Sequence, residues 1–168
     1  LVQEQVTFHR LGLVVIDDEV QIRRLLRITQ GSAGHAVREV ETGQLGLDAV
    51  AKRAPDAVIL DLGLPDIPGL EVLRRLREWS RVPVLVLTVL AAETDKVAAL
   101  DAGAVGYLLK DTEPEDIVKA VRDGAAGGVP LSPRAARALL PSNRPAARED
   151  ALTPREREVL LLVAAGLP

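Results

Sequence analysis

Five short runs of hydrophobic residues, each bounded by glycine, proline or polar residues, divide most of the chain. A short continuous hydrophobic run between turn-forming residues is typical of a strand that is buried on both faces, as in a parallel sheet. The predicted strands are Leu11–Ile16, His35–Val40, the run from Asp56 that ends on Asp61, Val82–Leu87 and Ala104–Leu109.

Segments with hydrophobic residues at helical spacing lie between these runs. Ile22, Leu25 and Leu26 would share one face of a helix, with arginines on the other face. The predicted helices are one around Ile22–Thr29, then Gly43–Ala54, Leu70–Trp79, Thr94–Asp101 and one that begins at Pro114. Strands and helices that alternate in this way predict an α/β fold, a doubly wound five-stranded parallel sheet with helices on both faces. The flavodoxin-like strand order 2-1-3-4-5 is a common arrangement of this kind.

The character of the chain changes after Gly128. A short helix is predicted over Leu131–Leu140, followed by a polar, proline-containing stretch. Thr153 and Glu156 have the spacing of a capping box, which predicts a further helix near the end. One amphipathic helix cannot bury its hydrophobic face alone, so we expect it to open a second domain. The predicted organisation is an N-terminal tail (1–10), the α/β domain (11–128), a linker (129–150) and an incomplete helical domain (151–168).

Composition narrows the class of protein. The 168 residues include no cysteine, which is compatible with a reducing compartment, and no hydrophobic run long enough to span a membrane. The first ten residues lack the pattern of a secretion signal. The net charge is −3, and the six arginines and four acids after residue 130 leave the α/β part acidic. We therefore expect a cytoplasmic protein whose α/β domain does not bind nucleic acid.

Polar residues follow four of the five predicted strands, at the edge where the ends of parallel strands meet. Asp17 and Asp18 follow the first strand, Asp61 the third, Thr88 the fourth and Lys110 the fifth. Acids before a helix also serve as ordinary N-terminal caps, so the pair after the first strand alone indicates little. Together, carboxylates at one edge predict a site for a hard divalent cation such as Mg²⁺. With a lysine and a hydroxyl added, the set suits transfer of a phosphoryl group onto a carboxylate.

The motifs VVIDDE, VILDLGLPDIPGLEVL, VLVLT and GYLLKD are similar to those of response-regulator receiver domains of two-component signalling, which have a CheY-like fold. The resemblance covers roughly Leu11 to Gly128 and implies that Asp61 is the phosphorylated residue. It further implies that Asp18 and Asp61 ligate Mg²⁺ with Asp17 alongside. The main-chain carbonyl of Gly63 would complete these ligands.

The resemblance also assigns roles to three residues near the predicted phosphorylation site. Lys110 would pair with the phosphoryl group, Thr88 would donate a hydrogen bond to it, and Tyr107 matches the aromatic residue that switches. A ring packed at the edge of the sheet is the structural alternative for Tyr107. The implied donor is the phospho-histidine of a sensor histidine kinase, and the implied consequence is homodimerisation. Such a domain is a switch and not an enzyme beyond its own phosphorylation and dephosphorylation.

The C-terminal sequence LTPREREVLLLVAAGLP resembles the opening of the LuxR-type helix-turn-helix domain of NarL/FixJ regulators. The recognition helix of that domain is absent, so DNA binding would require the complete output domain. By contrast, ETGQLGLDAV, DLGLPDIPGLEVLRRLREWS and DKVAALDAGA resemble the OmpR/KdpE subfamily. A natural mosaic or an engineered hybrid would give this combination, and the tail indicates a transcriptional output.

Three alternative functions are compatible with parts of this sequence. A receiver-like domain could serve as a docking module without phosphorylation. A phosphatase with an aspartyl nucleophile, similar to the haloacid-dehalogenase class, would need a second aspartate two residues after Asp61, where the chain has Gly63. A flavodoxin-like cofactor binder is weaker still, because the chain has only one Trp, one Tyr and one Phe.

Overall fold

The computed structural model describes residues 9–131, which form a five-stranded parallel sheet. The strand order is β2-β1-β3-β4-β5, which confirms the predicted doubly wound fold and its common order. Each strand is short and, apart from the edge strand β2, almost completely buried. The strands are β1 Gly12–Ile16, β2 Ala36–Val40, β3 Ala57–Leu60, β4 Val84–Thr88 and β5 Gly106–Leu109.

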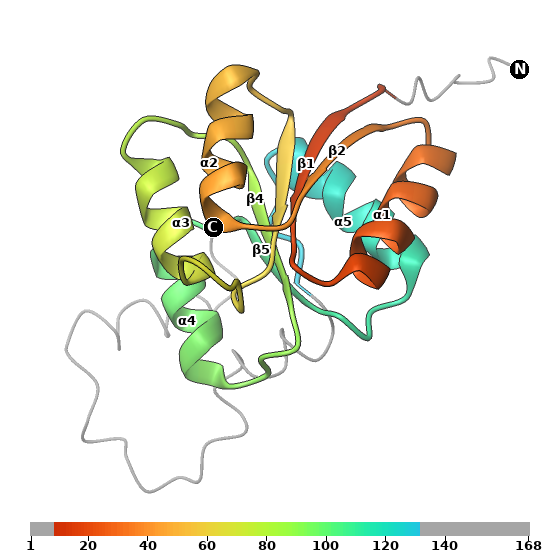
Figure 1. Ribbon diagram of the computed structural model, residues 1–168. Helices are drawn as coiled ribbons and strands as arrows, with labels where there is room; N and C mark the ends of the chain where they lie inside the picture. Colours follow the sequence, from red (N-terminus) through yellow and green to blue (C-terminus); the bar gives the residue numbers. More distant parts are fainter. Residues whose placement is uncertain (1–8, 132–168) are drawn as a thin grey trace, which may run out of the picture. The chain divides into compact units, whose positions relative to one another are not determined.

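A helix follows each strand, and the helices cover both faces of the sheet (Figure 1). Helices α1 and α5 contact each other on one face, while α2 contacts α3 and α3 contacts α4 on the other. This two-sided cover explains why the strands carry continuous hydrophobic runs and not an alternating pattern. The helices are α1 Val20–Ser32, α2 Gly43–Lys52, α3 Gly69–Arg77, α4 Glu93–Asp101 and α5 Pro114–Ala125.

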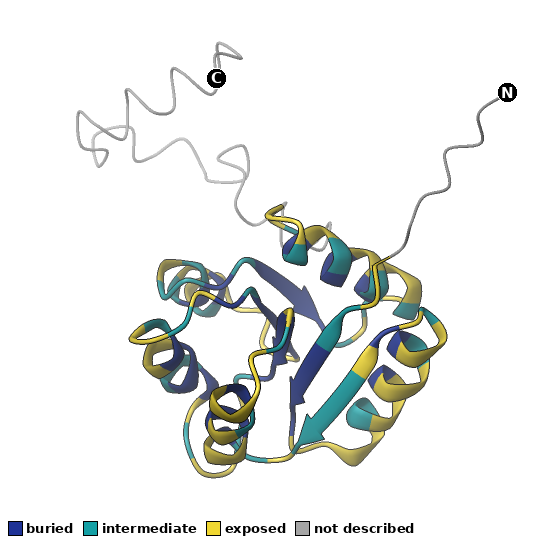
Figure 2. Ribbon diagram, turned by 90° about the horizontal axis from the view of Figure 1, so that it is seen from above, coloured by how far each residue is buried: buried dark blue, intermediate teal, exposed yellow. Residues whose placement is uncertain are grey.

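Two hydrophobic cores lie on the two faces of the sheet, and Figure 2 shows the buried strands between the partly exposed helices. In α3, Val72, Leu73 and Leu76 have no exposed surface and point into the first core, as their spacing predicts. In α5, Ile117 and Val121 are buried in the second core, on the opposite face of the sheet, together with Leu26 of α1. The sheet is therefore held from both sides, which keeps the ends of its strands in register.

The boundaries of several elements differ from the expected ones; β5, for example, begins at Gly106 and not at Ala104. Strand β4 begins at Val84, and its neighbour Pro83 contributes only its carbonyl, which accepts a hydrogen bond from the Val58 N–H at 2.8 Å. A proline has no N–H to donate to the ladder, which explains the late start. Helix α2 ends at Lys52 and does not reach Ala54.

The last described residues run beside the edge strand β5. The N–H of Tyr107 donates to the carbonyl of Pro130 at 3.2 Å, and Leu131 forms a parallel β-bridge with Tyr107. Leu131 also packs against the first core. The predicted short helix thus has a bridge at its first residue, and the rest of it, with the linker and the helical domain to residue 168, lies outside the described residues.

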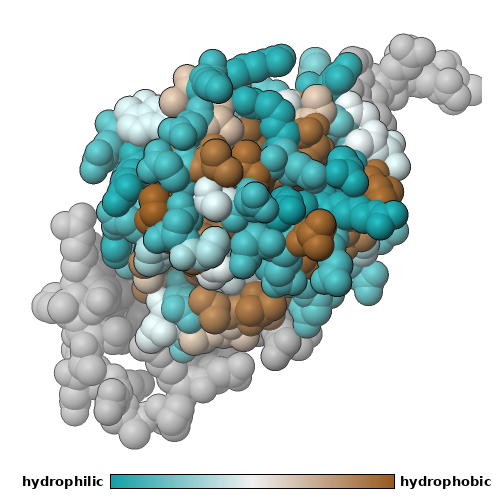
Figure 3. All heavy atoms as spheres, viewed as in Figure 1, coloured by the Kyte–Doolittle hydropathy of each residue, from teal (hydrophilic) through white to brown (hydrophobic). Residues whose placement is uncertain are grey.

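On the face of the molecule shown in Figure 3, hydrophobic residues form separate small groups that hydrophilic residues surround. Hydrophobic residues scattered singly over a surface are normal and require no partner. Within residues 9–131, no helix has the length and apolar character required to cross a membrane.

His35, buried just before β2, should make the stability of the fold depend on pH. Its Nδ1 accepts a hydrogen bond from the Leu11 N–H at 3.1 Å, which requires the neutral ring. Burial and the charge of Arg122 lower the pKa of His35 below its ordinary 6.5, against an opposing effect of Asp56. The unfolded chain therefore takes up a proton first as the pH falls. The free energy of unfolding should accordingly decrease as the pH drops below the ordinary value.

Urea unfolding at several pH values measures this effect. His35→Gln should lower the unfolding free energy at neutral pH by about 1 kcal/mol. It should also remove the part of the pH dependence that lies just below the ordinary histidine pKa. His9→Gln, at an exposed position, is the matched control and should keep the wild-type profile. Identical pH profiles of the unfolding free energy for wild type and His35→Gln would show that His35 is not the source of this pH dependence.

Candidate functional site

Lys110, directly after β5, lies at the centre of an acidic cluster. Its Nζ donates to Asp61 Oδ2 at 3.0 Å and to Glu19 Oε1 at 2.9 Å. The same nitrogen lies 3.0 Å from Asp17 Oδ2 and 3.2 Å from Asp17 Oδ1. Residues far apart in the sequence are thus joined by one ammonium group at the edge of the sheet.

The sheet itself places these side chains. The N–H of Asp17 donates to the Val40 carbonyl at 3.1 Å, and the N–H of Asp61 donates to the Ile16 carbonyl at 2.9 Å. The N–H of Lys110 likewise donates to the Thr88 carbonyl at 3.0 Å. Each of these three residues therefore extends the ladder of its strand by one bond. This is why a carboxylate directly after a buried strand is fixed at the edge.

Burial makes the electrostatics of this cluster strong. The side chains of Lys110, Asp17 and Asp61 are only 6%, 3% and 6% exposed, whereas that of Glu19 is 48% exposed. Burial alone would lower the pKa of Lys110, but its hydrogen bonds to the three carboxylates outweigh this effect and raise it. Burial raises the pKa of Asp17, although its bonds to the Glu19 N–H and to Lys110 oppose the change. The lysine therefore stays charged among more acids than it can neutralise.

The loop that follows β3 is held at both ends. The N–H of Gly63 lies 3.4 Å from Asp61 Oδ1, and the N–H of Gly69 donates to the Leu62 carbonyl at 2.9 Å. Asp66 accepts hydrogen bonds from two N–H groups of the first turn of α2, at 2.8 and 2.9 Å. These bonds, above all that from Gln44, lower the pKa of Asp66. The loop thus links Asp61 to α2 and α3.

Thr88 and Tyr107 both bind Leu90, in the loop after β4. The Leu90 N–H donates to Thr88 Oγ1 at 3.4 Å, and the hydroxyl of Tyr107 donates to the Leu90 carbonyl at 2.7 Å. Neither Thr88 nor Tyr107 has exposed surface. Burial, with smaller effects of Asp95 and Asp61, raises the pKa of Tyr107 to about 12, so its hydroxyl stays a donor. The ring occupies an inward, packed position in this structure.

The structure brings together three of the residues predicted from the sequence, Asp17, Asp61 and Lys110. Asp18 is exposed, and it is not among the acids whose oxygens gather there. Glu19 also takes part in the cluster, although it was not among the predicted site residues. It precedes α1 and makes no side-chain cap, so its carboxylate is available to Lys110. An acid two residues after a strand-end aspartate was the only sequence signal for it.

The cluster has the donors that a divalent cation requires. Asp17, Glu19 and Asp61 each offer a carboxylate oxygen, and these oxygens lie within 4.8 Å of one another. All are hard oxygen ligands, and the three carboxylates face a single ammonium group, so a further cation would balance their remaining negative charge. The residues present therefore fit a metal ion such as Mg²⁺.

The doubly wound sheet, with a buried lysine and two aspartates at its carboxyl edge, is the arrangement expected of a receiver domain. Comparison with known proteins gives the same class. Residues 13–122 match the family described as the response regulator receiver domain. The chain belongs to this family, which confirms the resemblance found in the sequence.

Two relatives represent the two subfamilies indicated by the sequence. The KDP operon transcriptional regulatory protein KdpE of Escherichia coli K12 is 53% identical over 99 residues, which cover 59% of this chain and 44% of that protein. The nitrate/nitrite response regulator NarL of the same strain is 40% identical over 164 residues, which cover 93% of this chain and 76% of NarL. The match thus spans less than half of the first relative. The resemblance of the chain to both KdpE and NarL is confirmed.

Solved structures show the same fold. A two-component response regulator of the LuxR family from Aurantimonas matches with a TM-score of 0.72 at 28% identity, covering 77% of this chain and 94% of that one. The receiver domain of the putative response regulator NarL from Mycobacterium tuberculosis matches with a TM-score of 0.66 at 31% identity. That match covers 71% of this chain and 98% of the other. The described fold therefore corresponds to a receiver domain.

Proposed function

We propose that this chain is a phosphorylation-dependent switch in which Asp61 accepts a phosphoryl group in the presence of Mg²⁺. The observation that carries this proposal is the Lys110 ammonium, 3.0 Å from Asp61 Oδ2 at the end of a buried strand. A carboxylate that lies at the edge of the sheet and faces a fixed positive charge suits an acyl phosphate, because charge on the transferred group must be neutralised.

In the proposed step, a carboxylate oxygen of Asp61 attacks phosphorus, and the bond from phosphorus to the donor nitrogen or oxygen breaks. The electron pair leaves with the donor: a histidine nitrogen then takes a proton, whereas acetate leaves as the carboxylate anion. Lys110 is already within hydrogen-bond distance of Asp61, so it can follow the new phosphoryl oxygens with little movement. Its raised pKa keeps it charged throughout.

The proposed ligands of Mg²⁺ are Asp18 and Asp61, with Asp17 alongside and the main-chain carbonyl of Gly63. The observed cluster adds Glu19 as a neighbouring acid. When bound, Mg²⁺ neutralises charge on the phosphoryl oxygens and orients the group.

The response to phosphorylation would pass through Leu90. A phosphoryl group on Asp61 offers acceptor oxygens to the hydroxyl of Thr88, which now accepts from the Leu90 N–H. Release of that contact would free the loop that Tyr107 also holds through the Leu90 carbonyl. Tyr107 in turn contacts the segment that leads to the C-terminal part of the chain, through Pro130 and Leu131. Phosphorylation of Asp61 can thereby alter the contacts of Pro130 and Leu131, where the chain leaves the receiver domain.

The proposed partners follow from the family and the relatives. We infer that a sensor histidine kinase supplies the phosphoryl group and that phosphorylation favours a homodimer. We infer that DNA is bound only through a complete LuxR-type output domain and that the protein acts in the cytoplasm. The names of the relatives, a transcriptional regulatory protein and a nitrate/nitrite response regulator, support this direction.

Acetyl phosphate tests the proposal without a kinase. Intact-protein mass spectrometry should show one added phosphoryl group on the wild type with Mg²⁺, and none when Mg²⁺ is chelated. Asp61→Asn should show no addition, because an amide cannot form the acyl phosphate. Asp101→Asn, at an exposed aspartate of α4, is the matched control and should react like the wild type. No addition to the wild type would leave a receiver fold that acts as a docking module.

A further inference from the structure

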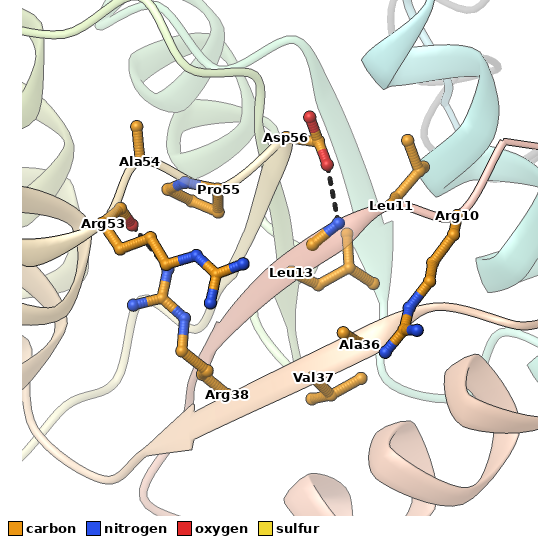
Figure 4. Close-up of a pocket in the computed structure, with 11 residues that line it drawn as sticks. Arg10, Leu11, Leu13, Ala36, Val37, Arg38, Arg53, Ala54, Pro55 and Asp56 are labelled. Carbon is orange, nitrogen blue, oxygen red and sulfur yellow. Dashed lines mark hydrogen bonds between the residues drawn. The ribbon is translucent and has the colours of Figure 1, made fainter.

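A cavity lies at the amino ends of β1, β2 and β3, on the edge of the sheet opposite Asp61. Its volume is about 430 Å³, within the range of small-molecule sites. Non-polar surface of Leu11, Val37 and Pro55 lines part of it (Figure 4). The cavity shares no residue with the acidic cluster, so it requires its own explanation.

Three arginines and one acid line this cavity. Figure 4 shows the guanidinium groups of Arg38 and Arg53 side by side on one wall, with Arg10 on the other side of the cavity. The acid, Asp56, already accepts a hydrogen bond from the Gly12 N–H at 2.6 Å. The lining is therefore positive, although the chain as a whole has a net charge of −3.

The three arginines differ in what holds them. Arg38 donates to the Ala49 carbonyl at 3.0 Å and to the Arg53 carbonyl at 2.5 Å, so it supports the end of α2. Among residues 9–131, the side chains of Arg10 and Arg53 have no hydrogen bond or ion pair, and both residues are exposed. Two charged groups that have no partner within the described part of the chain thus flank a partly non-polar cavity.

We propose that this cavity binds a small organic phosphate. The phosphate dianion would lie between Arg10 and Arg53, because a guanidinium binds phosphate oxygens in a bidentate manner. The non-polar surface of Leu11, Val37 and Pro55 would receive the body of the ligand, which inorganic phosphate lacks. The proposal does not depend on phosphorylation of Asp61.

Calorimetric titration at low ionic strength, without Mg²⁺, tests the proposal with AMP, inorganic phosphate and adenosine as probes. AMP should bind, inorganic phosphate should bind about tenfold more weakly, and adenosine should not bind. Added salt should weaken the binding of AMP, because the arginines are exposed. Equal binding of AMP and adenosine, or no binding of AMP at millimolar concentration, would overturn the proposal.

Variants of the full chain locate the site. The double variant Arg10→Gln with Arg53→Gln should bind AMP at least about tenfold more weakly, because each lost guanidinium removes a charge-assisted hydrogen bond. Arg24→Gln, at an exposed arginine of α1, is the matched control and should bind like the wild type. Asp61→Asn should also bind AMP normally, which separates this site from the proposed phosphorylation site. Unchanged binding in the double variant would exclude the cavity.

Discussion

Replacing Lys110 by methionine should lower the free energy of unfolding by about 3 to 5 kcal/mol at neutral pH when divalent cations are absent. The change removes the one ammonium group that joins Asp17, Glu19 and Asp61. Two of these carboxylates are almost completely buried, so they would be left close together without a cation. Methionine keeps most of the volume of the lysine stem, so the loss reports on charge and not on packing.

The loss of stability caused by Lys110→Met should depend on pH and on Mg²⁺. The raised pKa of Lys110 means that its contribution is fully present below the ordinary lysine pKa of 10.5 and disappears only when the pH rises through the higher value of the folded state. In acid the loss should shrink, because protonation of Asp17, whose pKa is already raised, relieves the repulsion. Added Mg²⁺ should stabilise the variant more than the wild type, because no ammonium competes for the carboxylates.

Urea unfolding in chelator and in Mg²⁺ measures both effects. Lys119→Met, at an exposed lysine of α5, is the matched control, and its unfolding free energy should change by less than about 0.5 kcal/mol. Equal stabilities of the two variants would show that the cluster does not depend on the ammonium group.

Gly69→Ala should lower the free energy of unfolding by about 3 kcal/mol or more. A Cβ atom at this first residue of α3 would overlap the carbonyl oxygen of Asp61 and lie 2.6 Å from Leu62 Cα. Both are backbone atoms, which cannot turn aside as a side chain can. Helix propensity alone would favour alanine by about 1 kcal/mol, so a loss of stability identifies the clash as the cause.

The same substitution should also impair phosphorylation, because relief of the clash must move the backbone of Asp61. Gly31→Ala is the matched control, since among residues 9–131 no atom beyond its chain neighbours and the nearby helix backbone lies within 4 Å of a Cβ atom there. That change, near the end of α1, should stabilise the fold by about 0.5 kcal/mol. Gly69→Ala with wild-type stability and wild-type phosphorylation would contradict the close approach of α3 to Asp61.

Much of the fold could be predicted because the chain carries strong local patterns. The buried strands are continuous hydrophobic runs, and Ile22, Leu73 and Ile117 mark helices by their spacing. The ends of the strands were harder to predict. Strand β4 begins after Pro83 because proline has no N–H to donate to the neighbouring strand, and the sequence does not show which strand that is. The position of Asp61 at a strand end was predictable because it directly follows the hydrophobic run of β3.

Other features depend on contacts between distant segments and could not be predicted. Glu19 joins the site only because Lys110 lies across the sheet edge from it. The shared contact of Thr88 and Tyr107 with Leu90 involves backbone atoms of a loop, which no residue pattern marks. The arginine-lined cavity likewise collects residues from three segments that meet only in the folded sheet.

The most direct test of the phosphorylation mechanism is to locate the phosphoryl group. After reaction with acetyl phosphate and Mg²⁺, borohydride reduces an acyl phosphate of aspartate to homoserine, and peptide mass spectrometry then identifies the modified residue. We predict homoserine at position 61 and at no other aspartate. Modification at another aspartate, or phosphorylated protein with no homoserine at all, would contradict the assignment of Asp61 as the phosphoryl acceptor.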